Sequence, residues 1–165
     1  MKAYLDIVKH VLEHGVKKDN RTATSTIAVP GQMFSHDMKD GSPLLTTKKV
    51  PFRLVASELE FFIKGITDKN WLIERKNHIW DEWCTPKKVP YAHDEETQQK
   101  MMSEPDLGPV YGFQWRHFGA QYLDKDTDYT NQGVDQLKRL VELLKKDPSD
   151  RRMLVMAWNP VSKPD

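Results

Sequence analysis

The strongest folding signal in the chain is an apolar helical pattern between residues 54 and 65. Its apolar side chains recur three or four positions apart, as they do on one face of a helix, and Gly65 follows them as a stop. The apolar residues are Leu54, Val55, Leu59, Phe62 and Ile63. The pattern predicts a helix with one face in the core, around which the rest of the chain must pack.

Two further segments have helical periodicity. Apolar residues recur over 4–12, with Gly15 as the stop, and over 134–144. A short helix is expected at 70–76 and a helical turn at 95–102.

Two regions favour strands. Residues 22–29 are rich in β-branched side chains and, with 32–36, predict a hairpin that turns at Pro30-Gly31. Residues 153–158 are almost continuously apolar, which is typical of a buried strand. Helices and strands do not alternate regularly, so we expect an α+β fold with a mixed sheet packed against helices.

Length and charge narrow the class of protein. The 165 residues fit one domain, 1–165, and the polar, proline-bearing segment 85–105 is interpreted as a surface insertion.

Twenty-five basic and 24 acidic side chains leave a net charge of +1, so the chain lacks the basic footprint of a nucleic-acid binder. No apolar run reaches membrane-spanning length and the first residues do not resemble a signal peptide, so a cytoplasmic location without membrane contact is expected.

The single cysteine, Cys84, excludes an internal disulfide and a cysteine-rich zinc cluster. The six histidines lack a metal-ligand spacing, so no metal site is expected. Cys84 has no histidine partner at a telling position. A small buried hydrophobe is favoured over a reactive thiol.

Three arginines stand before expected strands. Arg21 precedes the hydroxyl-rich residues 22–26, and Arg151 and Arg152 lead into 153–158. Guanidinium forks grip phosphate or carboxylate through two hydrogen bonds, so several around one anion form a phosphate site. Adjacent arginines on a strand point to opposite faces, so one of the pair can face a partner subunit. The alternative is that each is simply solvated.

Glu58 lies within the apolar pattern of residues 54–65 and has little polar surface nearby. A carboxylate on the buried stripe has a raised pKa, which suits a general acid or base at neutral pH. The alternative, a glutamate at the edge of the stripe with its carboxylate in water, is equally compatible with the pattern.

Two tryptophans lie three residues apart, at Trp80 and Trp83, with Ile79 beside them. On one side of a helical turn they would offer flat walls on which a planar heteroaromatic ligand stacks. Ordinary core tryptophans are the alternative.

Glycines bracket Tyr111, at Gly108 and Gly112. Such glycines favour a bent backbone that brings the tyrosine into a crevice, where its hydroxyl can order a water or assist a proton transfer. A tyrosine that only fills a turn is the alternative.

Taken together, these segments resemble the thymidylate synthase family. They occur in that family's order and cover essentially the whole chain. The matching motifs are Arg21-Thr22-x-Thr24, Pro43-Leu44-Leu45-Thr46-Thr47-Lys48-Lys49, Glu58-Leu59-x-x-Phe62-Ile63-x-Gly65, Ile79-Trp80-Asp81-Glu82-Trp83, Leu107-Gly108-Pro109-Val110-Tyr111-Gly112-x-Gln114-Trp115-Arg116, Asp150-Arg151-Arg152 and Ala157-Trp158-Asn159-Pro160.

The resemblance implies a homodimeric methyltransferase of nucleotide biosynthesis. The family converts dUMP to dTMP and uses methylenetetrahydrofolate, without a metal, as both carbon donor and reductant. A cysteine attacks the pyrimidine so that the neighbouring ring carbon can accept the one-carbon unit. A related branch, the pyrimidine nucleotide hydroxymethylases, lets water finish the reaction and is the alternative activity.

The resemblance also implies a role for each candidate residue. Arg21 would bind the dUMP phosphate, and Arg151 and Arg152 would reach across the dimer to the partner's phosphate. The proton network around the pyrimidine and folate would centre on Glu58, with Tyr111 assisting proton removal. The folate would be bound by Lys48 near its glutamate tail and by a wall of Ile79, Trp80 and Trp83.

The sequence departs from the family pattern at three places. Asn20 stands where an aspartate is usual, and Cys84 stands where alanine is common, so the resemblance does not make Cys84 the nucleophile. The family's nucleophile lies in a Pro-Cys-His motif beyond the segment that matches the last residues here. We therefore expect an N-terminal portion of such an enzyme, with a fold incomplete at its C-terminus and inactive alone, or a non-catalytic binding or dimerisation fragment.

Overall fold

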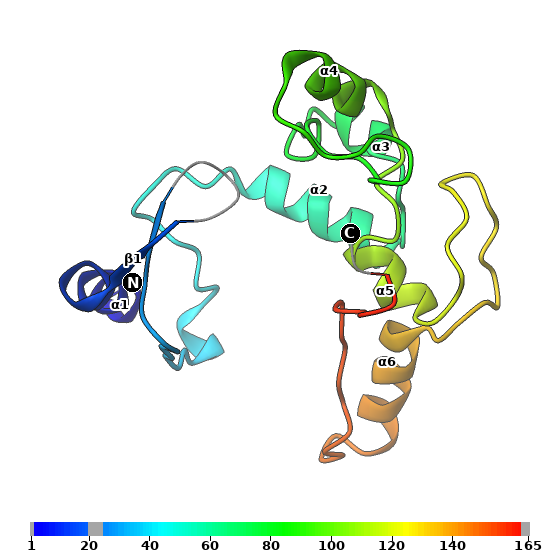
Figure 1. The fold of residues 1–165 in the computed structure, drawn as a ribbon. Helices are drawn as coiled ribbons and strands as arrows, with labels where there is room; N and C mark the ends of the chain where they lie inside the picture. The colour runs from blue at the N-terminus through cyan, green and yellow to red at the C-terminus, as the bar shows by residue number, and fades with distance from the viewer. Residues whose placement is uncertain (1, 20–24, 163–165) are drawn as a thin grey trace. The chain divides into compact units, whose positions relative to one another are not determined.

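The computed structural model describes residues 2–19 and 25–162 of the chain. Contacts divide the chain into two compact units, residues 1–51 and 52–165. Figure 1 shows the helices and strands in chain order.

The first unit begins with an amphipathic helix and a short hairpin. Its elements are α1 (Lys2–His14), β1 (Val16–Lys18), β2 (Thr26–Ala28) and the 3-10 turn η1 (Met38–Asp40). Gly15 ends α1 by donating its N–H to the Val11 carbonyl at 2.8 Å. A Cβ at this position would overlap the Ile27 side chain, so the close approach requires glycine. The prediction of a first helix stopped by Gly15 is confirmed.

The predicted hairpin is wrong in its pairing. β2 runs antiparallel to β1, with Val16 opposite Ala28, and residues 32–36 form no strand. Pro30 has no N–H to donate to a ladder, which explains why β2 ends before the predicted turn. The polar sequence of β1 concealed its role as the partner.

The second unit is built from five helices in its described residues. They are α2 (Phe52–Ile63), α3 (Asn70–Ile73), α4 (Glu95–Ser103), α5 (Tyr111–His117) and α6 (Gln136–Lys146). The predictions of helices over 54–63, 95–102 and 134–144 are confirmed, and α3 occupies the first part of the predicted 70–76. Aspartate caps begin α4 and α6, because Asp94 and Asp135 each accept a backbone N–H three residues on, at 2.9 Å.

The core of this unit forms where α2 crosses α5. Phe61, Phe62 and Leu72 are buried with Leu107 in one cluster. Gly112 makes the approach possible, because a Cβ there would lie 2.7 Å from the Phe62 carbonyl oxygen. A second cluster of Phe113, Tyr122 and Tyr129 lies on the far side of α5.

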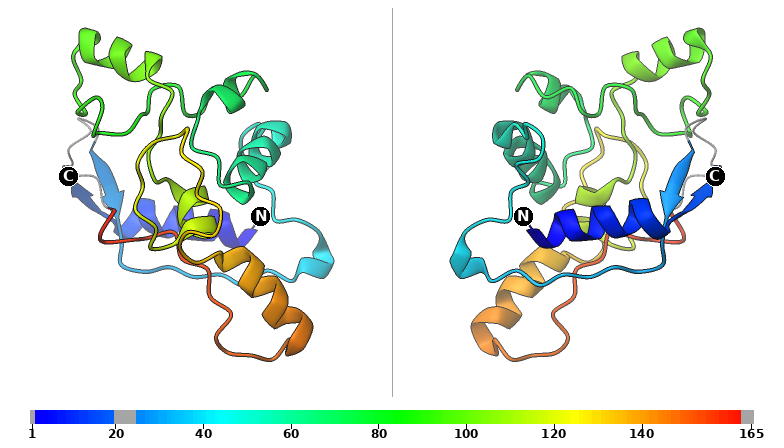
Figure 2. Two further views of the ribbon diagram at one scale, coloured as in Figure 1. Left: turned by 90° about the vertical axis from the view of Figure 1, so that its right-hand side faces the viewer. Right: turned by 90° about the vertical axis from the view of Figure 1, so that its left-hand side faces the viewer.

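The fold is mostly helical with a small antiparallel sheet, and the predicted mixed sheet is absent from the part of the chain that the structure describes. Residues 153–158 run back along α6 without strand pairing (Figures 1 and 2). Their burial alternates, leaving Leu154, Met156 and Trp158 more than half exposed. The prediction of a buried strand was therefore wrong, because apolarity marks a segment for burial but cannot supply the neighbouring strands.

Two other findings concern the chain as a whole. Among the described residues, no helix combines the length and apolarity needed to cross a membrane. The segment 85–105 includes α4, which buries Met101 at 3% exposure; its interpretation as an insertion stays a prediction.

Candidate functional site

The structure brings Glu58 and Trp80 into direct contact. The indole Nε1–H of Trp80 donates a hydrogen bond to Glu58 Oε1 at 2.7 Å. The side chain of Glu58 is half-buried on α2. The carboxylate is therefore held by a neutral donor, with part of its surface left for solvent or a ligand.

Tyr111 joins this pair through an aromatic cluster around Phe62. The rings of Trp80 and Tyr111 pack edge-on against Phe62, with centroids 6.0 Å and 5.4 Å away, and lie 6.1 Å from each other. Tyr111 stands at the first position of α5 and is 51% exposed. The cluster thus gathers three predicted site residues, Glu58, Trp80 and Tyr111, on one surface.

The turn that carries Trp80 is tied to α2 by a buried asparagine. Asn77 is 0% exposed and donates its amide to the Leu54 carbonyl at 3.0 Å and to Ser57 Oγ at 2.9 Å. These two bonds place the turn beside the helix that carries Glu58.

A buried lysine supports the same turn from its other side. Lys69 is 1% exposed, and its ammonium donates to the carbonyls of Asp81, Trp83 and Met101 at 2.7, 2.9 and 2.7 Å. Burial lowers the pKa of Lys69, and the charges of Cys84 and Asp81 partly oppose that shift. One side chain therefore joins the tryptophan turn to α4.

The other two predicted wall residues, Ile79 and Trp83, are exposed. Ile79 is 48% exposed, and Trp83 is 42% exposed. The Trp83 ring stacks on Tyr91, with centroids 5.7 Å apart and planes 8° from parallel. Residues 79–82 form a turn and Trp83 follows it, so the two tryptophans do not lie on a helix as predicted.

The loop before Tyr111 is anchored by a buried carboxylate. Asp106 is 1% exposed and accepts hydrogen bonds from Tyr122 Oη at 2.6 Å and the Gly108 N–H at 2.7 Å. Burial, reinforced by the bond to Asp106, raises the pKa of Tyr122 well above its usual range. Gly108 has a φ of +75°, which an L side chain rarely adopts.

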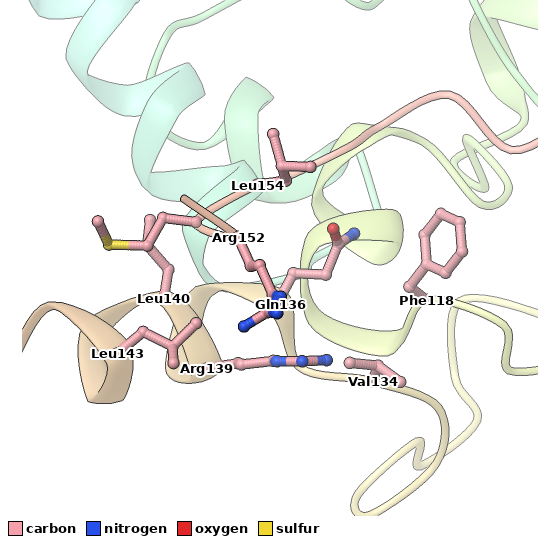
Figure 3. Close-up of a pocket in the computed structure, with 9 residues that line it drawn as sticks. Phe118, Val134, Gln136, Arg139, Leu140, Leu143, Arg152 and Leu154 are labelled. Atoms are coloured by element: carbon pink, nitrogen blue, oxygen red, sulfur yellow. The ribbon is translucent and has the colours of Figure 1, made fainter. Parts of the chain in front are cut away.

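Arg151 and Arg152 are exposed and lie in a turn rather than on a strand. The argument that a strand would send them to opposite faces therefore does not apply. Asp150 caps the turn by accepting the Arg152 N–H at 2.8 Å. The Arg152 side chain lines a cavity of about 290 Å³ together with Arg139 of α6 (Figure 3).

Two predicted ligands of the first unit stay predictions. Arg21 falls outside the described residues. Lys48 is exposed in a bend.

Cys84 is a buried free thiol, 9% exposed. Burial raises its pKa, although the positive charge of Lys69 opposes the shift. A raised pKa leaves less of the reactive thiolate, so the structure favours a buried hydrophobe over a nucleophile, as the sequence did.

No group of three or more potential metal ligands occurs in the described parts of the chain. His78 and Asp81 form a close pair, with Nδ1 and Oδ2 2.8 Å apart. Among the described atoms, Asp81 Oδ1 is buried without a hydrogen-bond partner.

Sequence reasoning missed the residues that position the site. Lys69 and Asn77 are polar residues in a segment that was expected only to form a short helix and a turn. Tyr91 lies within the presumed insertion and stacks on Trp83. Lys69, Asn77 and Tyr91 owe their positions to contacts outside their own segments, for which periodicity carries no signal.

Comparison with known proteins agrees with this arrangement of motifs. The family model described as thymidylate synthase matches residues 2–164. The chain is 44% identical over 161 residues to the human thymidylate synthase, with 98% of the chain and 50% of that protein covered. It is 45% identical over 158 residues to a bifunctional dihydrofolate reductase-thymidylate synthase of Paramecium tetraurelia, with 96% of the chain and 33% of that protein covered.

A viral relative is equally similar. The thymidylate synthase of equine herpesvirus 2 is 44% identical over 164 residues, with 98% of the chain and 54% of that protein covered. The chain thus spans about half the length of these single-function relatives and a third of the bifunctional one.

Proposed function

The chain belongs to the thymidylate synthase family, and we propose that it contributes to the reductive methylation of dUMP to dTMP with methylenetetrahydrofolate. The observation that carries the proposal is the hydrogen bond from Trp80 to Glu58 beside the exposed Tyr111. It couples a carboxylate to an aromatic wall, as a site that moves protons on a planar substrate requires.

Glu58 is the proposed proton-handling residue. Its half-buried carboxylate keeps one oxygen on the Trp80 donor, and the other is available to a water or to the pyrimidine carbonyl. The hydrogen bond from the indole fixes the orientation of the carboxylate, so that its second oxygen stays directed at the position proposed for the pyrimidine ring.

Tyr111 is proposed to assist proton removal. Its ring is held by Phe62 and Trp80, while half of its surface is exposed, so its hydroxyl is accessible to substrate. Gly112 and the positive φ of Gly108 support this placement by letting the start of α5 approach α2.

Folate binding is proposed for Ile79, Trp80 and Trp83, with Lys48 toward the glutamate tail. The exposed faces of Ile79 and Trp83 support the assignment, because a wall must be accessible to stack on its ligand. The phosphate of dUMP is proposed to be held by Arg21 and, across a homodimer, by Arg151 and Arg152. The reaction is proposed to occur in the cytoplasm.

The nucleophile is proposed to come from outside these 165 residues. Cys84 is the only cysteine in the sequence, and burial disfavours its thiolate. In the family a cysteine supplies the covalent bond to the pyrimidine, and the residues here bind, orient and protonate around it.

The test is an assay of the complete gene product with methylenetetrahydrofolate and either dUMP or dCMP, following dihydrofolate formation by absorbance. We expect turnover of dUMP with release of dihydrofolate. Turnover of dCMP alone, or product formed without dihydrofolate, would instead indicate a hydroxymethylase. Binding of dUMP without turnover would indicate a non-catalytic module.

A further inference from the structure

Segment 85–105 places an aromatic ring against the exposed tryptophan of the candidate site. The rings of Trp83 and Tyr91 stack with centroids 5.7 Å apart and planes 8° from parallel. His93, two residues further on, packs edge-on against the Tyr91 ring at 5.0 Å. Trp83 nevertheless remains 42% exposed. Because a planar ring has two faces and Tyr91 covers one of them, the exposed surface of Trp83 lies on its other face and its edges.

A tight turn brings Tyr91 back toward the tryptophan. The N–H groups of Lys88 and Val89 both donate to the Thr85 carbonyl, at 3.0 and 3.2 Å, so the chain reverses its direction there. Pro90 disfavours helical backbone at the residue before it, which prevents the turn from continuing as a helix. The stacked ring therefore follows directly from the local sequence of the segment.

The two ends of the segment are bound to each other. Thr85 donates its N–H to the Asp106 carbonyl at 2.8 Å. The Lys88 ammonium lies 3.4 Å from Glu104 Oε1, which adds an ion pair across the same base. The segment is thus a closed loop that holds Tyr91 at a defined distance from the core.

The backbone of Trp83 is fixed to the same loop by a buried donor. The ammonium of Lys69 binds the Trp83 carbonyl at 2.9 Å and the Met101 carbonyl at 2.7 Å, and Met101 belongs to α4 within the segment. Met101 is itself 3% exposed. The tryptophan is therefore held twice by one loop, through its main chain by Lys69 and through its ring by Tyr91.

We propose that Tyr91 is a positioning residue for the folate, which holds the Trp83 ring in one orientation and leaves a single face for the planar heterocycle to stack on. This inference rests on the proposed function, which assigns Trp83 to the folate wall. An exposed tryptophan without a neighbour samples several rotamers, and a ligand that binds it must order the ring. A ring that is already stacked is preorganised, and the heterocycle completes a stack of three layers.

The first test measures the steady-state kinetics of the complete gene product for each substrate separately. Tyr91→Ala should raise the KM for methylenetetrahydrofolate about fivefold, as loss of one aromatic pair does, and leave kcat and the KM for dUMP within about twofold. Tyr91→Phe keeps the stacked ring and should retain the KM of the unaltered protein. The control is Met102→Ala, which removes another exposed apolar side chain of the same segment and should leave the folate KM unchanged.

The second test measures folate binding without turnover. In calorimetric titrations with dihydrofolate in the presence of dUMP, the Kd for dihydrofolate should rise about fivefold in Tyr91→Ala and stay unchanged in Tyr91→Phe and Met102→Ala. Circular dichroism checks that each variant folds. If Tyr91→Ala does not fold, Tyr91→Leu replaces it, because leucine keeps apolar bulk but has no flat ring to stack.

Four results would overturn the inference. An unchanged folate affinity in Tyr91→Ala would show that the stack does not matter for binding. Tighter binding in that variant would show that Tyr91 occupies the place of the ligand. An equal loss in Met102→Ala would show a general effect of the segment, and an equal loss in Tyr91→Phe would show that the hydroxyl acts and not the ring.

The two tests also separate this inference from the proposed function. Dihydrofolate binding that depends on the Tyr91 ring, in a protein that does not turn over dUMP, would contradict the proposed function alone. Turnover of dUMP with the same folate KM in Tyr91→Ala as in the unaltered protein would contradict the role of Tyr91 alone.

Discussion

Trp80 donates its indole N–H to the carboxylate of Glu58, a residue 22 positions earlier in the sequence, at 2.7 Å. The contact joins the turn of Trp80 to α2 and fixes the orientation of the Glu58 carboxylate beside the aromatic cluster around Phe62. Its energetic and chemical consequences can be measured separately.

Trp80→Phe keeps an aromatic ring against Phe62 but removes the donor to Glu58. We expect the free energy of unfolding to fall by about 1.5–3 kcal/mol, the range for a hydrogen bond to a charged group. Chemical denaturation followed by circular dichroism measures it. Glu58→Gln is the control, because its amide oxygen still accepts from Trp80; an equal loss in both variants would contradict the assignment.

Lys69→Met retains the length of the side chain but leaves the carbonyls of Asp81, Trp83 and Met101 without their shared donor. We expect destabilisation of about 2 kcal/mol or more, since each unsatisfied buried carbonyl is costly. The exposed Lys138→Met should change stability by less than about 0.5 kcal/mol. Equal urea midpoints for the two variants would rule out a supporting role for Lys69.

Gly112→Ala should force α5 away from α2, because the added Cβ would lie 2.7 Å from the Phe62 carbonyl oxygen. We expect the free energy of unfolding to fall by about 1–3 kcal/mol, as for other overpacked contacts, and the tryptophan fluorescence of the chain to change. The control is Gly31→Ala, because a Cβ added at Gly31 would have no atom within 4 Å. Gly119 is unsuitable as a control because its φ of +85° would strain an alanine. Gly31→Ala should therefore leave both observables unchanged.

The Cys84 thiol should react slowly with iodoacetamide in the folded chain and quickly after unfolding in guanidinium chloride. Its burial and raised pKa both reduce the accessible thiolate. Comparable rates in the two states would show that Cys84 is exposed or activated.

Stability should also depend on pH through Cys84. Its folded pKa lies above the ordinary value of 9.0, mainly through burial, with Glu104 and Asp106 raising it further and Lys69 and Lys88 opposing them. The unfolded chain therefore releases the thiol proton first. The stabilising contribution is complete below pH 9.0 and is lost as the pH rises through the folded pKa. The stability difference between the chain and Cys84→Ala should shift in favour of the alanine variant over that range; a constant difference would contradict the burial effect.

Arg151→Ala should inactivate the complete protein if, in the proposed homodimer, Arg151 binds the partner's substrate phosphate. Mixing it with a variant that lacks the nucleophilic cysteine should restore part of the activity, because a mixed dimer contains one intact site. An Arg151→Ala protein that stays inactive after proven subunit exchange would place the arginine's action within its own subunit.

Local periodicity was sufficient for the helices and insufficient for the strands. The pattern around Leu54 and Phe62 predicted α2 to within two residues at each end, because a helix satisfies its backbone internally. Strand pairing depends on residues elsewhere in the chain, so the polar Val16–Lys18 was missed as the partner of β2. Residues 153–158 failed as a predicted strand for the same reason.

For the candidate site, the structure bears on the positions of the predicted residues, and their roles stay predictions. Glu58, Trp80 and Tyr111 were singled out by residue type and setting, and the structure brings them together. Nothing in their spacing indicated the hydrogen bond between Glu58 and Trp80. Lys69 and Asn77 are buried, which their polar residue types do not predict. Burying a lysine or an amide is favourable only when each of its polar atoms finds a hydrogen-bond partner, and these partners cannot be inferred from local sequence.

The side chain of Gln136 affects which side chains of residues 153–158 face α6 and which face outward. Its amide oxygen accepts the Met156 N–H at 2.9 Å, and its amide nitrogen donates to the Met156 carbonyl at 2.7 Å. The Gln136 side chain thus forms with Met156 the pair of backbone hydrogen bonds that a neighbouring strand would form. This pairing favours one of the two ways in which alternate side chains of the segment can face α6. A slip by one position would turn Met153 and Val155 outward and Leu154 inward, so the two hydrogen bonds to Gln136 favour the observed facing of these apolar side chains.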